Sequence, residues 1–474
     1  MATGATSGRC GAPVIPTLVG YSALVLATIV GFFVIQTYGE TLVAPAPGPA
    51  ESFVEPPARP VNTLLQVLVA LAAVIAAGHA LGRLFRYVGQ PPVIGEVVAG
   101  ILLGPSLLGA EASAWVLPPD AASYLGVIAQ IGVILYMFLV GLELNGGLLK
   151  HRAHATIATS HASILIPFIL GALLALSLYP RLSTRDVPFT SFALFMGVAM
   201  SSTAFPVLAR ILSDRRMTRT DLGVVALSCA ATDDVTAWCL LALVVGVAKA
   251  HVSESLLVIA GAAVYIGFML LVARPALRWA AARWEGGVFS PDRFALIFVT
   301  LLLSAIATEA IGIHAIFGAF LLGAVIPHDS AVAKACHRQL HHVVTILLLP
   351  AFFAFTGMRT RIDLLSGLNE WLICGVIIIV ATIGKFGGTF LAARLTGLPA
   401  RDAAVLGTLM NTRGLMELIV LNIALDLGVI SPTLFAMMVI MALVTTVATS
   451  PVLLLLKPGM SPRPMPAQAK PAIN

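Results

Sequence analysis

The chain has 474 residues, of which 59% are hydrophobic and only 11% are charged. Because a soluble domain carries about 25% charged residues, this composition excludes an ordinary soluble protein. The net charge of +6 does not indicate a nucleic-acid partner, since the arginines lie in short stretches between apolar segments. We therefore expect an all-α polytopic membrane protein, in which each spanning segment satisfies its own backbone hydrogen bonds.

The first apolar segment covers residues 15–37, and a Pro-rich linker follows it to about residue 60. Only one basic residue, Arg9, precedes the segment, and the apolar stretch exceeds the roughly 7–15 residues of a signal-peptide core. We therefore favour a retained extra N-terminal helix over a cleaved signal peptide.

Thirteen further apolar segments follow, and we number them spans 1 to 13 in chain order. Their approximate limits are 62–82, 92–109, 122–144, 155–179, 188–213, 220–248, 252–279, 290–308, 311–327, 343–358, 370–393, 402–426 and 432–456. Most lysines and arginines outside the spans follow odd-numbered spans or lie in the C-terminal tail, so the positive-inside rule places these loops and both termini in the cytoplasm. The expected domains are an N-terminal segment (1–60), a transmembrane domain (61–457) and a short cytoplasmic tail (458–474), in a cell (inner or plasma) membrane.

The chain contains a weak internal repeat. IGEVVAGILLG (94–104) in span 2 resembles IHAIFGAFLLG (313–323) in span 9, and MFLVGLEL (137–144) in span 3 shares its glycine register with FAFTGMRT (353–360) in span 10. Both pairs are seven spans apart, and because seven is odd the two copies cross the membrane in opposite directions. An inverted repeat, here about 62–248 and 290–456, is typical of secondary transporters. Chance similarity between apolar helices is the alternative.

Inverted-repeat transporters place discontinuous helices at equivalent positions of the two halves. In span 5, Pro206 lacks an N–H, and the hydroxyls of Ser202 and Thr203 can bond the backbone that it frees. In span 12, polar and charged residues interrupt an apolar helix, namely Asn411, Thr412, Arg413 and Glu417. We expect both helices to be broken and to expose carbonyls that can coordinate a cation. An ordinary proline kink is the alternative for span 5.

Asp233 and Asp234 stand in the middle of span 6. A charge at that depth costs at least ~2.5–3.5 kcal/mol, so an intramembrane acid indicates an ion or proton site. Lys385 lies in span 11 and, if buried, needs a counter-ion. We expect it to pair with Asp233, which leaves Asp234 free to bind a cation or a proton. The alternative is that Lys385 extends to the cytoplasmic interface.

Several strings together resemble one known family. PPVIGEVVAGILLGPSLLG, FLVGLELN, SSTAFPVLARIL, TDDVTAW, IHAIFGAFLLG, LLLPAFFAFTGMRT and MNTRGLMELIVLN are similar to the sodium/hydrogen exchanger domain of the monovalent cation–proton antiporters. The closest likeness is to the second family of that superfamily, which includes bacterial potassium-efflux antiporters and plant cation/proton exchangers. The resemblance covers about residues 62–456, in the expected order. Potassium-efflux members often carry a C-terminal nucleotide-binding regulatory domain, which we do not expect in the short tail.

The resemblance implies a 13-helix inverted-repeat fold, to which the N-terminal helix is extra. A core of spans 4–6 and 11–13 would hold the crossed broken spans 5 and 12, and the remaining spans would form the interface of a homodimer. Asp234 matches the family's ion-binding aspartate. Asp233 and Lys385 match the acid and the lysine that pair in electrogenic members, and Thr203 is a further candidate ligand.

We therefore expect a secondary active transporter that exchanges Na⁺ or K⁺ for protons by alternating access, rather than an enzyme, with no cofactor and no metal centre. An ion channel or a non-transporting sensor on the same scaffold is the alternative. An intramembrane aspartyl protease is disfavoured, because adjacent acids on one helix point about 100° apart and cannot share a proton face to face. The choice between Na⁺ and K⁺, and between electrogenic and electroneutral exchange, stays open.

Two lesser features complete the sequence. The five cysteines match no metal or disulfide pattern and are interpreted as packing residues (Cys10, Cys229, Cys239, Cys336 and Cys374). The stretch 328–342 is rich in histidine, and we favour a solvated basic loop there over a zinc or pH-sensing cluster.

Overall fold

The computed structural model describes residues 14–45, 63–143, 153–184, 187–215, 217, 220–249, 255–284 and 290–456. Within these ranges eleven helices are long and apolar enough to cross a membrane, or twelve when one pair bent by 44° at a short break is counted as a single span. Two shorter apolar helices accompany them, Pro92–Leu103 and Ala315–Val325. The expectation of an all-helical polytopic membrane protein is confirmed.

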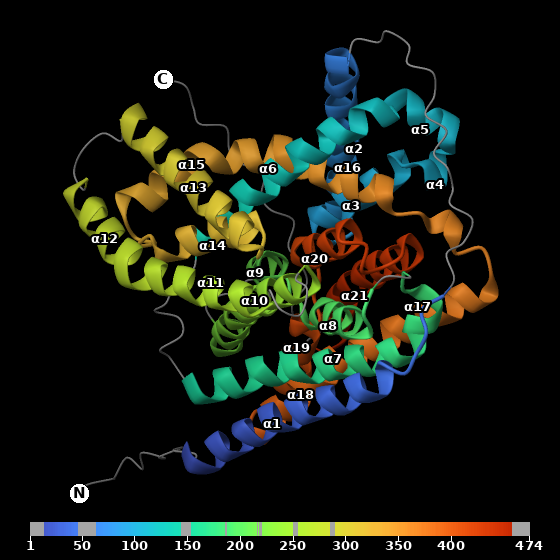
Figure 1. Cartoon of the computed structure of the whole chain (residues 1–474), viewed down its shortest axis with the longest axis vertical. Coiled ribbons are helices and arrows are strands. Elements are labelled where there is room, and N and C mark those ends of the chain that lie inside the picture. Colours follow the sequence, from blue (N-terminus) through green and yellow to red (C-terminus); the bar gives the residue numbers. More distant parts are fainter. Residues whose placement is uncertain are drawn as a thin grey trace, which may run out of the picture.

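The helices pack mainly within two sets (Figure 1). The first, which we call the central group, comprises α7 (Ala153–Leu182), α8 (Phe189–Ser201), α9 (Phe205–Asp214), α10 (Asp221–Lys249), α17 (Leu368–Thr382), α18 (Gly388–Leu395), α19 (Ala400–Met410), α20 (Leu415–Asp426) and α21 (Pro432–Leu456). A π-helical turn, Ile383–Gly387, joins α17 to α18.

The second set, the flanking group, comprises α2 (Thr63–Tyr87), α3 (Pro92–Leu103), α4 (Pro105–Leu108), α5 (Ala110–Val116), α6 (Pro119–Glu143), α11 (Ser255–Phe268), α12 (Arg274–Arg283), α13 (Pro291–Ile311), α14 (Ala315–Val325), α15 (Ala331–Val343) and α16 (Leu349–Arg359). Few contacts cross between the two sets. The boundary between them is therefore a natural place for relative movement.

The N-terminal helix α1 (Val14–Gly39) lies alongside α7, at the edge of the central group (Figure 1). Its inner face buries Thr28 and Ile35, and the Phe32 ring meets that of Phe168 with 5.8 Å between centroids. The expected helix over residues 15–37 thus packs on the helices that carry the site.

Glycines hold the flanking group together at two places where backbones touch. A Cβ atom on Gly141 of α6 would lie 2.3 Å from the Phe320 carbonyl oxygen of α14, and one on Gly323 of α14 would lie 2.9 Å from the Cα of Gly141. Similarly, a Cβ atom on Gly104 would lie 3.0 Å from the carbonyl oxygen of Gly357 in α16. Only residues without a side chain permit such an approach.

One expected loop is wrong. Residues 331–343, interpreted from sequence as part of a solvated basic loop, form α15. The Ser330 side chain accepts a hydrogen bond from the N–H of Ala333 and so caps the helix at its start. Val332, Cys336 and Leu340 recur at helical spacing and are buried, so the segment is amphipathic rather than uniformly polar.

Candidate functional site

The first helix break lies between α8 and α9. Ser202 and Ala204 have extended backbone angles (φ −63°, ψ 139° and φ −92°, ψ 90°), so the chain leaves the helical path after Ser201 and resumes it at Phe205. Pro206 stands in the first turn of α9, where a missing N–H costs nothing. The break is therefore an unwound segment, and the alternative of an ordinary proline kink is wrong.

The second break separates α19 from α20 at residues 411–414 and bends the helix pair by 44°. The two breaks touch: the N–H of Ala204 donates to the carbonyl of Thr412 at 3.0 Å, and the Thr203 hydroxyl lies 3.4 Å from the carbonyl of Met410. Thr446 of α21 holds both main-chain groups of Arg413, accepting from its N–H at 2.9 Å and donating to its carbonyl at 2.8 Å.

The C-terminal end of α8 is neutralised by two cations. Arg413 donates to the carbonyls of Ala199 and Met200, each at 2.9 Å, and the Lys385 ammonium donates to the carbonyl of Ser201 at 2.5 Å. This end of a helix carries partial negative charge, which both side chains compensate. The carbonyls in the last turn of α8 are therefore already bonded, and the expectation of cation-coordinating carbonyls applies to the unwound residues that follow it.

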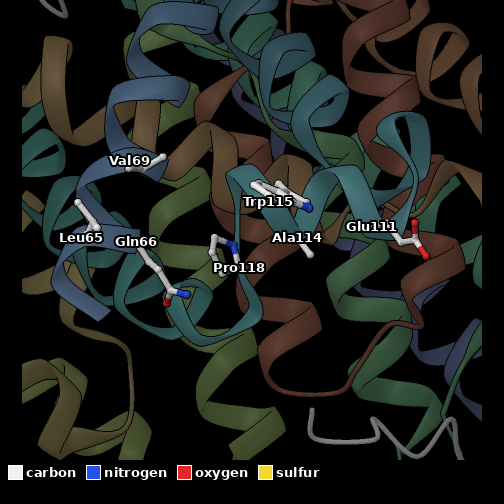
Figure 2. Close-up of a pocket in the computed structure, with 7 residues that line it drawn as sticks. All are labelled: Leu65, Gln66, Val69, Glu111, Ala114, Trp115 and Pro118. Atoms are coloured by element: carbon white, nitrogen blue, oxygen red, sulfur yellow. The ribbon is translucent and has the colours of Figure 1, made fainter. Parts of the chain in front are cut away.

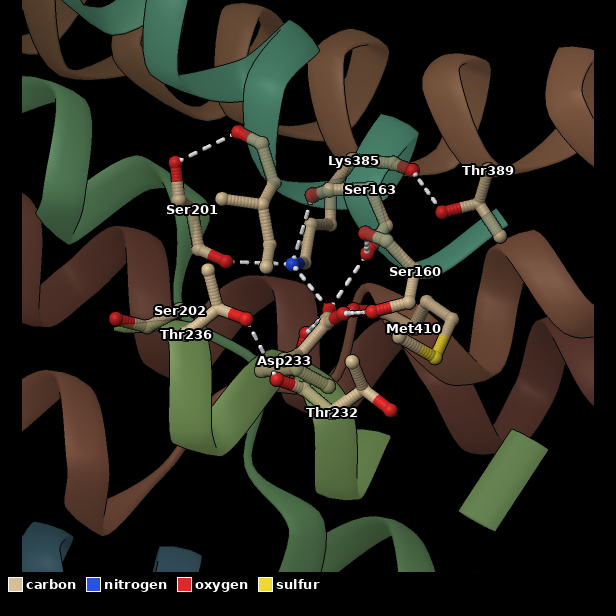
Figure 3. Close-up of polar contacts among 12 residues, drawn as sticks. Ser160, Ser163, Ser201, Ser202, Thr232, Asp233, Thr236, Lys385, Thr389 and Met410 are labelled. Atoms are coloured by element: carbon tan, nitrogen blue, oxygen red, sulfur yellow. Dashed lines mark hydrogen bonds and ion pairs between the residues drawn. The ribbon is translucent and has the colours of Figure 1, made fainter. Parts of the chain in front are cut away.

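The Asp233 carboxylate is surrounded by hydrogen-bond donors (Figure 3). Its carboxylate accepts from the hydroxyls of Ser160 at 2.6 Å, Ser163 at 2.5 Å and Thr203 at 2.9 Å, and it lies 3.1 Å from the Lys385 ammonium. Lys385 also donates to the carbonyl of Ser163 at 2.9 Å. Both charged side chains are fully buried, so the expected Lys385–Asp233 contact exists and the lysine does not reach the interface.

Sequence reasoning missed Ser160 and Ser163 of α7. They stand three residues apart in an apolar span, which places them on one helix face. That spacing was the available signal. It is a weak one, because a serine in an apolar helix usually bonds to a carbonyl of the preceding turn.

Asp234 has a different environment. It is 1% exposed and receives a hydrogen bond from the backbone N–H of Phe205, at the positive end of α9. Among the described residues its Oδ1 atom has no hydrogen-bond partner. One acid of the adjacent pair is thus saturated with donors, and the other has a free oxygen.

A second buried ion pair joins Arg413 to Glu417 at 3.1 Å, in the first turn of α20. Three buried carboxylates (Asp233, Asp234 and Glu417) therefore surround the breaks with two buried cations (Lys385 and Arg413). With all five ionised, the cluster has one negative charge in excess. The excess belongs to Asp234, because the other two acids each contact a cation.

The remaining expected site residues lie at the breaks without contacting these charges. Thr412 is buried, and its hydroxyl donates to the carbonyl of Leu409 at 2.8 Å. Asn411 is 7% exposed, and its Oδ1 atom finds no partner within the described ranges. Ser202 is buried, and its hydroxyl lies 3.3 Å from the carbonyl of Val198.

A cleft of about 260 Å³ runs along the boundary between the two groups. The central group contributes Ala204, Pro206, Val207, Arg210, Leu415 and Met416, and the flanking group contributes residues that include Glu96, Tyr136, His341, Leu349 and Phe353. Because Ala204 belongs to the first break and Leu415 follows the second, the cleft reaches the two breaks.

A separate cavity of about 540 Å³ lies between α2 and α5 and includes Gln66, Glu111 and Trp115 in its lining (Figure 2). None of its lining residues belongs to the breaks. Near the mouth of the cleft, His337 lies 2.9 Å from Glu143 and stacks on His341. In the part of the chain that the structure describes, no three His, Cys, Asp or Glu side chains are placed to hold a metal ion.

Comparison with known proteins gives a consistent result. The sequence matches the family model described as sodium/hydrogen exchanger, transmembrane, over residues 69–455. It is 41% identical over 404 residues to the Na⁺/H⁺ antiporter NhaS4 of Synechocystis sp., which covers 84% of this chain and 98% of the relative. It is 39% identical to cation/H⁺ antiporter 20 of Arabidopsis thaliana (85% of this chain) and 33% identical to K⁺/H⁺ antiporter 1 of Saccharomyces cerevisiae (79% of this chain).

The chain spans 50% of the Arabidopsis relative and 44% of the yeast relative. Among solved structures, the sodium proton antiporter MjNhaP1 of Methanocaldococcus jannaschii is similar, with a TM-score of 0.61 and 15% identity over 83% of this chain and 98% of that chain. At that identity the likeness is one of fold.

Proposed function

The chain belongs to the sodium/hydrogen exchanger family, and from this premise we propose that it is a secondary active transporter that exchanges Na⁺ or K⁺ for protons, with Asp234 as the group that binds them in turn. The family is one of transporters and not of enzymes. The observation that carries the assignment of the site is the buried Oδ1 atom of Asp234, which has no hydrogen-bond partner among the described residues and lies beside two helix breaks that contact each other.

Competition at one carboxylate couples the two fluxes. A proton or a cation neutralises Asp234, and either one removes the cost of its buried charge. The two cannot occupy the same oxygens together, so loading one requires release of the other. Asp233 is held by its hydroxyl donors, and its contact with Lys385 keeps the lysine beside the site until a cation binds.

Alternating access would come from movement of the central group against the flanking group, which together form the transport domain of residues 61–457. The inverted repeat supports this division. In the repeat, Gly104 corresponds to Gly323 and Gly357 to Gly141, and the two close contacts join Gly104 to Gly357 and Gly323 to Gly141. The flanking group is thus built from two equivalent helix pairs, as a 13-helix inverted-repeat fold with an extra N-terminal helix requires.

Orientation and assembly are part of the same proposal. The distribution of basic residues supports an orientation with both termini, including the tail of residues 458–474, in the cytoplasm, and we propose the inner or plasma membrane of the cell as the location. A homodimer would form through the flanking group. The large apolar side chains exposed on α11 to α13, such as Leu257, Leu271 and Leu303, agree with a surface that faces lipid or a second copy.

The test is uptake of 22Na⁺ and of 86Rb⁺, in parallel, into proteoliposomes with an imposed pH gradient. We expect cation uptake in exchange for protons by the wild type and none by Asp234→Asn, which keeps the shape of the side chain. Asp292→Asn is the matched control, because it makes the same change at an exposed position. Substantial proton-coupled uptake by folded Asp234→Asn would reject the site, and cation flux that moves no protons would favour the channel alternative.

A further inference from the structure

Two helices, α16 of the flanking group and α20 of the central group, meet along the boundary between the groups. At one end they line the cleft, with Leu349 and Phe353 on α16 and Leu415 and Met416 on α20. At the other end their side chains are joined by polar contacts. In the proposed orientation, the cleft separates the two helices at the cytoplasmic end, and polar contacts join them at the outer end.

Arg359, the last residue of α16, makes the central contact of this outer end. Its guanidinium lies 2.6 Å from the carboxylate of Asp426 and donates to the side-chain oxygen of Asn422 at 3.1 Å, and both partners stand on α20. The same group stacks over the Phe355 ring at 5.1 Å, which fixes its orientation.

A second, deeper contact backs the arginine. The Asn422 amide donates to the hydroxyl of Thr356 at 2.9 Å, and these side chains are 6% and 0% exposed. The side chain of Asn422 on α20 thus bonds two residues of α16, accepting from Arg359 with its oxygen and donating to Thr356 with its nitrogen. Separation of the two helices would break all of these bonds together and would expose the Asn422 amide and the Thr356 hydroxyl, which are now buried, to water.

We propose that Arg359, Asp426, Asn422 and Thr356 form an outer latch that holds the cleft open to the cytoplasm and must release for the site to face outward. This inference rests on the proposed function, since it assigns the contacts to one state of an alternating-access cycle. An isolated exposed ion pair would contribute little. Here the pair shares an arginine with a buried amide, and between α16 and α20 the ion pair and the side-chain hydrogen bonds of the described residues all lie at this end.

The first test locks the latch. Thr356→Cys with Asn422→Cys is made in a chain whose native cysteines are replaced by serine, and the pair is oxidised in proteoliposomes. We expect oxidation to abolish proton-coupled 22Na⁺ uptake and dithiothreitol to restore it, whereas each single cysteine variant is unaffected by oxidation. The latch would be overturned if the oxidised protein, with its disulfide verified by mass, took up 22Na⁺ as fast as the same protein after treatment with dithiothreitol.

The second test weakens the latch by substitution of Arg359. Thr345→Cys places a thiol in the cleft, in the same serine background, and its labelling by a membrane-impermeant maleimide from the cytoplasmic side reports the open cleft. We expect Arg359→Ala to slow labelling by up to about fivefold, the upper limit for losing one partly exposed ion pair. Charge reversal, Arg359→Asp with Asp426→Arg, restores most of the rate, because the pair re-forms in the opposite sense.

Arg181→Ala is the matched control, since it removes an exposed arginine from the end of α7. Equal labelling of the wild type and Arg359→Ala would reject the latch, as would equal slowing by Arg181→Ala. The labelling assay needs no ion flux. A wild type that fails to exchange cations for protons therefore rejects the proposed function, while unchanged labelling in an actively exchanging protein rejects the latch alone.

Discussion

Two neighbouring carboxylates on α10 acquire different roles from what surrounds them. Asp233 is held by three hydroxyls and a lysine, whereas Asp234 has one backbone donor and an oxygen with no partner in the described part of the chain. Chemically identical side chains thus have different surroundings, which is why we propose Asp233 as a fixed counter-ion and Asp234 as the exchangeable site. The difference comes from α7, the break before α9 and the π-helical turn that carries Lys385, which together contribute the donors to Asp233.

The buried pair makes a prediction about stability. Lys385→Ala leaves Asp233 buried without a cation, which costs on the order of 3–5 kcal/mol for a buried pair, so thermal stability in detergent falls. Lys385→Ala with Asp233→Asn recovers part of that loss, because the uncompensated charge is gone. A double-mutant cycle on melting temperatures measures the coupling. Strictly additive effects would show that the two side chains are independent.

For individual residues, the sequence predicted contacts best where a buried charged side chain requires a counter-ion. A lysine deep in an apolar span requires a counter-ion, so its pairing with Asp233 could be predicted. The bonds from Arg413 to the carbonyls of Ala199 and Met200 could not, because they depend on how closely two broken helices cross. Nothing in the residue order fixes that distance.

Among the elements, the glycine contacts determine how near helices can come. The Phe320 carbonyl oxygen lies where a side chain at Gly141 would begin, and the Phe138 carbonyl oxygen stands in the same relation to Gly323. Since backbone atoms cannot turn aside as side chains can, the helices themselves must shift to accept even a methyl group.

We therefore expect Gly141→Ala and Gly323→Ala each to destabilise the protein by roughly 1–3 kcal/mol, as overpacking does. Gly375→Ala in α17 is the control, because a Cβ there meets nothing within 4 Å and alanine favours a helix. Melting temperatures by intrinsic fluorescence, with uptake assays in parallel, compare the three. A Gly141→Ala protein as stable as Gly375→Ala would contradict the close approach.

The sequence predicted the helices better than their ends. Every expected span meets at least one helix, because long apolar runs in a membrane have few alternatives. It failed at α15, where charges and histidines hid a buried face of Val332, Cys336 and Leu340. Hydropathy is averaged over a window of residues, so the buried and the polar face of an amphipathic helix cancel, and the mean hydropathy resembles that of a loop.

For the molecule as a whole, the buried charges bear on voltage. If a cation on Asp234 weakens the hold of Asp233 on Lys385, the lysine also gives up its proton, and two protons leave for each cation that enters. Each cycle then moves one net charge, worth about 2.3 kcal/mol per 100 mV. If Lys385 keeps its proton, exchange is one for one and electroneutral.

We expect the electrogenic scheme. Proteoliposomes without a pH gradient, made positive inside by outward diffusion of thiocyanate, should accumulate 22Na⁺, because each turnover carries one net positive charge out. Lys385→Ala cannot release that proton, so any exchange that it retains should not respond to voltage. Accumulation by the wild type that ignores the voltage would reject the two-proton scheme and leave the antiporter assignment intact.

The occupied end of α8 has a consequence for which ions are carried. An alkali ion that leaves water must have its hydration shell replaced, and strict discrimination by radius needs several fixed carbonyl dipoles at matched distances. Here the last three carbonyls of α8 already bind Lys385 and Arg413. If a cation binds Asp234 as proposed, these three carbonyls are not free to replace its water, so we expect Na⁺ and K⁺ to differ little in affinity and their relative abundance on each side of the membrane to decide which one is transported.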